Sequence, residues 1–196
     1  MAPIAGPGPQ SERADAARNR ARVLEAAAAL FAERDPATVT MDDIARRAGV
    51  GRATLYRRYP DRGAIAGALL SEHERALQDA LLAGPPPLGP GAAPAARLEA
   101  FLLALAGLHE RHGYLSLAIE TERRRLETGA HAAWRLHVEH LLEEAGAGAE
   151  RGALADQLLA AVSPSLLTFQ RERLGRTPGE IEAALRVLAR RVAVRP

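Results

Sequence analysis

Apolar residues recur at intervals of three and four along most of this chain, a period typical of helices with one buried face. The expected helices cover residues 12–34, 41–48, 52–58, 62–82, 98–109, 114–127, 130–145 and 153–173, with a restart at Ser163-Pro164, and a last helix opens at Thr177-Pro178. Alanine and leucine are abundant, whereas β-branched and aromatic residues are scarce, so no sheet is expected. The pattern predicts an all-α fold of about nine helices.

The ends of the first helices carry stop and start signals. Asp35-Pro36 ends the first helix, because proline disfavours a helical residue before it and aspartate tolerates the left-handed backbone. Thr40 is expected to cap the second helix, and Asp43 completes a capping box three residues later. Gly49 ends that helix, and Asp61 is expected to cap the long helix from residue 62.

Residues 44–62 have the spacing of a helix-turn-helix, in which Ile44 anchors the first helix. Ala45 lets the two helices cross closely, and Gly49 permits a positive φ in the turn. Val50 and Leu55 are expected to fasten the second helix to the first. The outward face of the second helix is then left to small and basic residues able to enter a major groove, namely Arg52, Ala53, Tyr56 and Arg57. An ordinary helical hairpin that happens to be basic remains the alternative.

All 26 basic side chains are arginine, and their surplus lies near the N-terminus. Residues 11–62 carry eleven arginines and eight acidic residues, whereas the other residues carry fifteen and sixteen. A polyanion would therefore be met by the first third of the chain. Cysteine is absent, which excludes thiolate chemistry, and no apolar run is long enough to span a bilayer. A cytoplasmic protein without a membrane partner is expected.

The stretch RARVLEAAAALFAERDPATVTMDDIARRAGVGRATLYRRYPDRGAIAGALL, residues 20–70, resembles the N-terminal domain of the tetracycline-repressor (TetR) family of transcriptional regulators. The rest of the chain matches only as a helical domain of the right length. The resemblance implies a homodimer that binds a palindromic operator in double-stranded DNA. It also implies release when a small-molecule effector, whose identity is open, enters the C-terminal domain. The domains are then an arm at 1–11, a DNA-binding domain at 12–60 and a ligand-binding and dimerisation domain at 61–196.

The resemblance also assigns DNA contacts to individual residues. It implies phosphate contacts for Thr40, Thr54, Tyr56 and Arg62, and base contacts for Arg52, Ala53 and Arg57, with Tyr56 also able to reach a base. Arg20 or Arg22 would touch the flanking backbone or minor groove. Tyr59 is expected in the core. Arg46 and Arg47 either contact phosphate or only solvate the second helix.

Three positions depart from the family pattern. Gly51 replaces the serine or threonine that normally caps the recognition helix, which removes a side-chain acceptor. Asp35 replaces the usual glycine after the first helix. Gly63 stands where an acidic residue is common, so the start of the next helix is expected to fray. None of these changes alters the proposed binding face.

The C-terminal part offers a linker and two sets of candidate residues. The linker is 84–94, which is rich in proline and glycine. Aromatic and imidazole side chains form the candidate ligand pocket, or simply a core: Phe101, His109, Tyr114, Trp134 and His137. A twofold partner is expected to cover the apolar stripes of the last helices, at Leu158, Val162, Leu166, Phe169, Ile181, Leu185, Leu188 and Val192. The alternative is that these stripes pack wholly within one protomer.

Catalytic motifs are missing from the sequence. There is no Gly-rich phosphate loop, no G-x-S-x-G elbow, no H-E-x-x-H and no cysteine nucleophile, so neither an enzyme nor a cofactor is expected. His109 with His112, and His137 with His140, are three residues apart, but common surface glutamates are the only further ligands nearby, so no metal is expected. A helical protein–protein adaptor with a basic N-terminal hairpin is the alternative, although it leaves the order of residues 44–62 unexplained.

Overall fold

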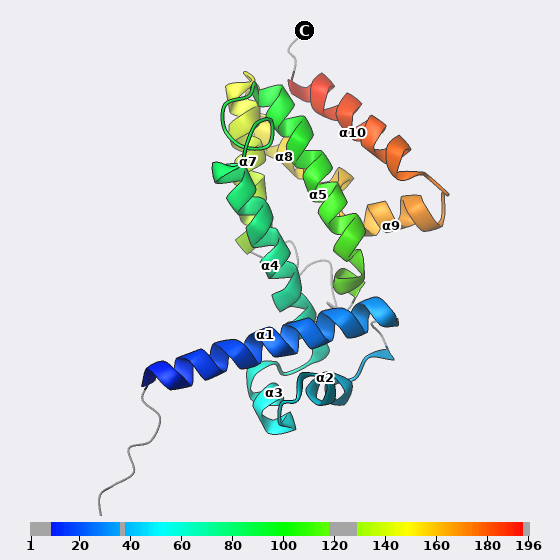
Figure 1. The fold of residues 1–196 in the computed structure, drawn as a ribbon. Coiled ribbons are helices and arrows are strands. Elements are labelled where there is room, and N and C mark those ends of the chain that lie inside the picture. The colour runs from blue at the N-terminus through cyan, green and yellow to red at the C-terminus, as the bar shows by residue number, and fades with distance from the viewer. Residues whose placement is uncertain (1–8, 36–37, 118–128, 194–196) are drawn as a thin grey trace, which may run out of the picture. The chain divides into compact units, whose positions relative to one another are not determined.

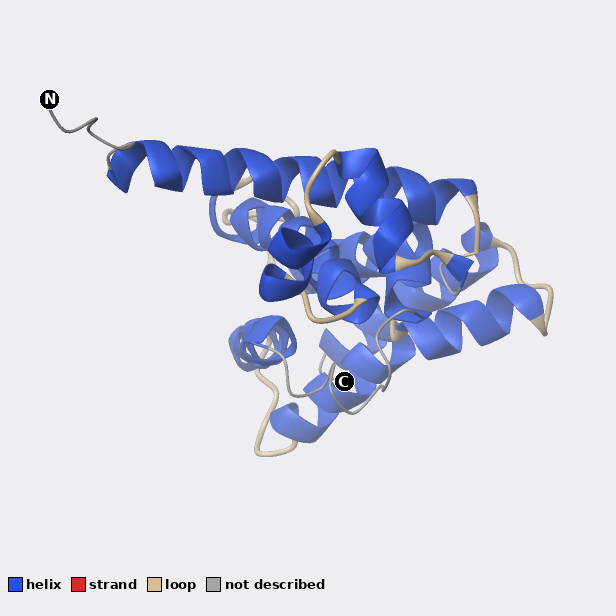
Figure 2. Cartoon of the chain, turned by 90° about the horizontal axis from the view of Figure 1, so that it is seen from below, coloured by secondary structure: helices blue, strands red, loops and turns tan. Residues whose placement is uncertain are grey.

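The computed structural model describes residues 9–35, 38–117 and 129–193. Within them it contains nine helices and no strand, so the predicted all-α fold is confirmed. Figures 1 and 2 show helices joined by loops. The helices are α1 (Pro9–Glu33), α2 (Met41–Ala48), α3 (Arg52–Arg58), α4 (Arg62–Ala83), α5 (Pro94–Leu117), α7 (Gly129–Glu144), α8 (Arg151–Ala161), α9 (Pro164–Glu172) and α10 (Pro178–Ala193).

Two compact units divide the chain, and the first extends to Leu69. The boundary between these compact units falls inside α4, and the domain division at residue 60 stays a prediction. The first turns of α4 belong to the N-terminal unit because their apolar side chains Ile65 and Ala66 are fully buried.

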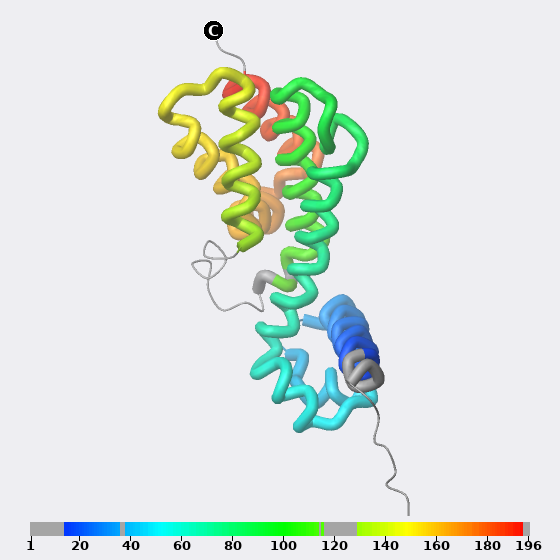
Figure 3. The backbone as a smooth tube through the Cα atoms, turned by 90° about the vertical axis from the view of Figure 1, so that its left-hand side faces the viewer, coloured from blue at the N-terminus to red at the C-terminus, as the bar shows by residue number. Residues whose placement is uncertain are grey.

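The core of the N-terminal unit is built from the apolar faces of its helices. Side chains of α1 to α4 meet in it, at Val23, Leu24, Ala27, Leu30, Phe31, Ile44, Ala45, Leu55, Tyr59 and Ile65. Figure 3, which views α1 nearly end-on, shows the short helices α2 and α3 beside it. Tyr59 is buried as predicted, and so are the expected anchors Ile44 and Leu55, whereas Val50 is only half-buried.

The first helix differs from its prediction at both ends. It starts at Pro9, inside the segment expected to be an arm, and it ends at Glu33. Asp35 was expected to tolerate the left-handed backbone, but no described residue other than glycine has a positive φ. The carbonyl of Asp35 instead accepts hydrogen bonds from the backbone N–H and the hydroxyl of Thr38, at 2.9 and 2.7 Å. A local turn therefore follows α1 in place of a left-handed cap.

The C-terminal unit contains α5 and α7–α10, together with the second part of α4. Its core is lined by Phe101, Leu102, Leu105, Trp134, Val138, Leu141, Leu142, Leu158, Val162, Ile181 and Leu185. Segment 84–94, predicted as a linker, runs between α4 and α5 within this unit and buries Gly89. Most of its other residues are exposed, and its assignment as a linker stays a prediction.

The helix break predicted at Gly113 is wrong, because α5 continues to Leu117. A glycine inside a helix costs only about 1 kcal/mol, which burial of neighbours such as Leu115 offsets. The helix predicted at 114–127 lies mostly outside the described residues. No single described helix is long and apolar enough to cross a membrane, although α8 and α9, bent by 41°, pass that test of length and composition as a pair.

Candidate nucleic-acid interface

The start of α2 is fixed by the capping box that the sequence predicted. The hydroxyl of Thr40 accepts a hydrogen bond from the backbone N–H of Asp43 at 3.1 Å, and the Asp43 carboxylate accepts one from the N–H of Thr40 at 3.2 Å. The hydroxyl of Thr40 also donates to that carboxylate, and these hydrogen bonds, with the nearby Arg34 and Arg46, lower the pKa of Asp43. Thr40 itself stays exposed, at a helix N-terminus suited to a phosphate.

The turn after α2 depends on Gly49, which has a φ of 62° and a ψ of 38°. Its N–H donates to the carbonyl of Arg46, and the N–H of Val50 donates to the carbonyl of Ala45. A Cβ at Gly49 would lie 2.5 Å from Nη2 of Arg22, which donates to the Gly49 carbonyl at 2.9 Å. The backbone conformation therefore favours glycine in this turn, whereas the Arg22 guanidinium, at the end of a flexible side chain, could move away from an added Cβ.

Helix α3 buries a single side chain, Leu55, which is 2% exposed. Tyr56 is 44% exposed, and the side chains of Ala53, Thr54 and Arg57 are exposed beside it. The outward face that the sequence predicted is therefore present on α3. Gly51 precedes α3 and provides no side-chain cap, as expected from this departure from the family pattern.

Several arginines of the N-terminal unit are bound by its own acidic residues. Arg47 makes a two-pronged ion pair with Glu33 at 2.6 and 2.7 Å, which joins α2 to α1 and lowers the pKa of Glu33. Arg46 lies 3.5 Å from Asp43 on the same helix. The sequence predicted that Arg46 and Arg47 either contact phosphate or only solvate α2. The sequence does not predict the ion pair between Arg47 and Glu33, because this pair depends on which faces of α1 and α2 pack together.

The arginines of α3 are held loosely. Nε of Arg52 lies 2.8 Å from the carboxylate of Asp42, and the two side chains are 68% and 42% exposed. Arg57 makes no ion pair or side-chain hydrogen bond within the described part of the chain. Arg62 opens α4 and is half-buried, and Asp61 caps that helix by accepting a hydrogen bond from the N–H of Ala64 at 2.7 Å. The predicted cap at Asp61 is confirmed.

Three of the residues predicted to line a ligand pocket, Phe101, His109 and Trp134, are buried in the C-terminal unit, and His137 is half-buried. The rings of Phe101 and His137 meet edge-on at 5.2 Å, and those of His109 and Trp134 at 6.0 Å. Nδ1 of His109 lies 2.6 Å from the carbonyl oxygen of Val162. Burial, the positive charge of Arg97 and the nearby His140 lower the pKa of His137 to about 4, against a smaller effect of Glu144.

These four side chains do not line the described cavity of the C-terminal unit, which lies between α4 and α5. The side chain of Tyr114 lies outside the described residues. The ligand-pocket assignment therefore stays a prediction. Within the described residues no group of three or more His, Asp or Glu side chains is placed to hold a metal ion.

The predicted dimer face is only partly exposed. Leu158, Val162, Ile181 and Leu185 are buried within the protomer, so little of their surface remains for a partner. The exposed apolar side chains on α9 and α10 include Leu166, Phe169 and Leu188 of the predicted set, and Val187, which sequence reasoning missed. Helical spacing marked the width of each stripe but did not distinguish an internal neighbour from an external one.

Comparison with known proteins finds relatives of the N-terminal part of this chain. Residues 23–69 match the family model described as bacterial regulatory proteins, tetR family. An HTH-type transcriptional regulator from Mycobacterium tuberculosis is 46% identical over 56 residues, and one from Mycobacterium bovis is 44% identical over 59 residues. These alignments cover 29% and 30% of this chain, and only 28% and 31% of the relatives' own length.

Solved structures extend the likeness to the whole fold. A TetR/AcrR-family regulator from Thermobifida fusca YX-ER1 has a TM-score of 0.63 at 20% identity, covering 87% of this chain and 95% of that chain. A TetR regulator from Rhodococcus sp. RHA1 has a TM-score of 0.62 at 20% identity, covering 91% and 97%. Residues 23–69 of this chain therefore match the model of the TetR family of bacterial regulatory proteins, and the all-helical chain has the fold of solved TetR-family structures.

Proposed function

We propose that the protein is a transcriptional repressor that binds a palindromic operator as a homodimer and releases it when a small-molecule effector binds the C-terminal unit. The observation that carries this proposal is the outward face of α3, where Tyr56 and Arg57 are exposed and a single buried residue, Leu55, anchors the helix. Such a helix can enter a major groove without moving its own core. The cytoplasm, where DNA is accessible, is the proposed compartment.

The proposed DNA contacts follow from chemistry and position. Arg52, Ala53 and Arg57 lie on the exposed face of α3 and are proposed to meet base edges, where a guanidinium can bind O6 and N7 of guanine. Thr40, Thr54, Tyr56 and Arg62 are proposed to bind phosphates, with Thr40 and Arg62 at the starts of α2 and α4.

The proposed dimer uses the exposed apolar side chains of α9 and α10. Phe169 is 50% exposed and Val187 is 60% exposed, and Leu166 and Leu188 are also exposed. A twofold partner would cover these side chains as a four-helix bundle and would place two α3 helices on the two halves of a palindrome.

Selection of duplexes from a random DNA library, followed by fluorescence anisotropy, tests the proposal. The selected sites should be palindromic, and Arg57→Ala should weaken operator binding about 5- to 150-fold per half-site, as for a lost base contact. Arg191→Ala is the matched control, because it removes an exposed arginine from α10. No enriched sequence, or equal losses for the two folded variants, would overturn the DNA-binding proposal.

Two further measurements test assembly and regulation. Phe169→Glu should give a folded monomer in analytical ultracentrifugation, whereas Leu136→Glu, at an exposed leucine of α7, should leave the dimer intact. In transcription from a promoter containing the selected operator, adding the protein should lower transcript yield. Unchanged or higher yield would refute the repressor assignment without affecting the DNA-binding proposal.

A further inference from the structure

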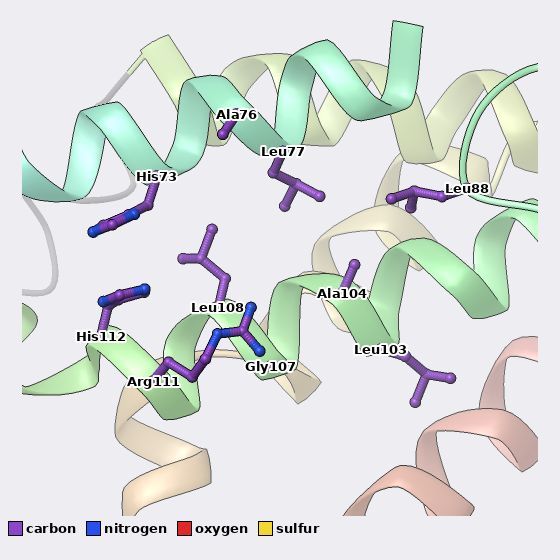
Figure 4. Close-up of a pocket in the computed structure, with 10 residues that line it drawn as sticks. All are labelled: His73, Ala76, Leu77, Leu88, Leu103, Ala104, Gly107, Leu108, Arg111 and His112. Carbon is purple, nitrogen blue, oxygen red and sulfur yellow. The ribbon is translucent and has the colours of Figure 1, made fainter. Parts of the chain in front are cut away.

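The C-terminal unit contains a cavity of about 340 Å³ between α4 and α5. Its lining is shown in Figure 4 and consists of His73, Ala76, Leu77, Leu88, Leu103, Ala104, Gly107, Leu108, Arg111 and His112. The volume is in the lower part of the range of small-molecule sites, roughly 300–1,000 Å³. No acidic residue is among these ten, and the cavity is partly open, since its lining residues Ala76 and Arg111 are exposed.

One end of the cavity is basic. The rings of His73 and His112 stack with their centroids 3.7 Å apart and an interplanar angle of 12°. In Figure 4 the guanidinium of Arg111 lies along α5 over Gly107, where a Cβ would lie 3.1 Å from its Nη1, and the residue is exposed. No carboxylate pairs with Arg111 in the part of the chain that the structure describes.

The two stacked imidazoles and Arg111 together give this end of the cavity a lining that suits an anion. Burial, the adjacent His73 and the positive charge of Arg111 all lower the pKa of His112, because a second positive charge is unfavourable there. A bound anion would remove that penalty and would accept hydrogen bonds from the guanidinium.

The other end of the cavity is apolar. Leu77 comes from α4, Leu88 from the loop before α5, and Leu103, Ala104 and Leu108 from α5. Figure 4 shows Leu77 and Leu88 on the side of the cavity away from the stacked rings. An alkyl body placed there would lose water contact against aliphatic side chains without burying a polar group.

We propose that this cavity binds an anionic amphiphile, a free monocarboxylate with an apolar chain. Its carboxylate is bound by Arg111 with His73 beside it, and its chain lies against Leu77, Leu88 and Leu108. The role of such a molecule as the effector rests on the proposed function, whereas its binding does not involve DNA.

Isothermal titration calorimetry of the full chain with octanoate, decanoate and dodecanoate tests the proposal, with 1-octanol and octylammonium as charge controls of equal length. We expect at least one carboxylate to bind at least about tenfold more tightly than 1-octanol, and octylammonium not to bind. Arg111→Gln should weaken carboxylate binding about tenfold or more, whereas Arg75→Gln, at an exposed arginine of α4 outside the lining, should not.

A second variant tests the apolar end. Ala104→Leu narrows the cavity and should weaken dodecanoate more than octanoate. The proposal is overturned when no carboxylate binds, when octanol and octanoate bind equally, or when Arg111→Gln leaves the affinity unchanged. Because no DNA is present, these outcomes leave the operator proposal untouched. Failure to select an operator likewise leaves the calorimetric result unaffected.

Discussion

Asp42 and Arg52 form an exposed ion pair at the edge of the proposed DNA-binding face, and replacing Asp42 tests whether Arg52 contacts DNA. Nε of Arg52 lies 2.8 Å from the Asp42 carboxylate, so a phosphate or base must compete with that carboxylate for the same guanidinium. Asp42→Asn preserves the size of the side chain and removes the competing charge. Tighter operator binding is therefore the expected direction.

The size of the effect follows from the exposure of the pair. With side chains 68% and 42% exposed, the pair contributes about 0.2–1 kcal/mol, and removing it should strengthen binding by about 1.4- to 5-fold per half-site. Two half-sites in a dimer double the free energy, which corresponds to about 2- to 30-fold for the whole operator. Asp42 also lies in the first turn of α2, so its loss should cost about 0.3–1 kcal/mol of stability.

Fluorescence anisotropy with the selected operator, over a series of salt concentrations, measures this effect. Asp42→Asn should tighten binding in the wild-type background but much less in an Arg52→Ala background. The remaining gain should match that of Glu25→Gln, which removes an exposed acidic charge from α1 and so reports the general effect of net charge.

The two-variant comparison gives a clear refutation. Equal gains from Asp42→Asn with and without Arg52 would mean that Arg52 does not exchange its carboxylate partner for DNA. Unchanged or weaker binding by folded Asp42→Asn would contradict the same reasoning. Urea unfolding of each variant separates these outcomes from a loss of structure.

Three further predictions concern stability. Gly49→Ala should lower the free energy of unfolding by about 1–2 kcal/mol, because it strains a φ of 62°. Gly67 lies in open space within α4, so Gly67→Ala should instead raise the free energy of unfolding by about 0.5–1 kcal/mol, and urea unfolding measures both variants. A change of the same sign in both variants would contradict the positive-φ role assigned to Gly49. Leu55→Ala should cost about 2–5 kcal/mol, and a loss below 1 kcal/mol, with α3 unchanged in circular dichroism, would refute its role as anchor. His137 has a folded pKa of about 4 against an unfolded value of about 6.5, so its contribution is complete above pH 6.5 and falls by as much as about 3 kcal/mol as the pH drops to 4. His137→Phe should flatten the pH dependence of the free energy of unfolding, whereas His140→Gln, at an exposed histidine, should not. Parallel plots of that free energy against pH for wild type and His137→Phe would disprove the contribution of His137.

The helices of the N-terminal unit were predictable because their signals are local. Thr40, Gly49 and Asp61 act on backbone groups within a few residues of themselves, and the capping bonds found in the structure are those the sequence indicates. The helix break at Gly113 was wrongly predicted because it rested on a local signal alone. The low helix propensity of glycine suggested a break, but packing of the surrounding α5 side chains outweighs that cost of about 1 kcal/mol.

Features that depend on the meeting of two helix faces were not predictable. The pairing of Arg47 with Glu33 spans two helices, and no spacing within either helix indicates it. The cavity beside His73 and Arg111 likewise needs the packing of α4 on α5, although His112 had been noted as half of a histidine pair. Burial of Leu158 and Leu185 in the protomer shows the same limit, since an apolar stripe does not identify its partner.

The distribution of ion pairs refines the argument from net charge in the N-terminal unit. Arg47 is bound by two short contacts to Glu33, and Arg22 donates to the carbonyl of Gly49. Both arginines therefore stabilise the packing of α1 against α2 and the turn that precedes α3. Arg52 has one exposed carboxylate partner, and Arg57 has no ion pair within the described residues. Releasing an exposed pair costs about 0.2–1 kcal/mol, whereas breaking the two-pronged pair would also loosen α2 on α1. Arg52 and Arg57, on the outward face of α3, are thus the arginines whose transfer to DNA costs the least free energy. Arg47 and Arg22 keep their contacts with Glu33 and Gly49, which hold α2 and α3 in place.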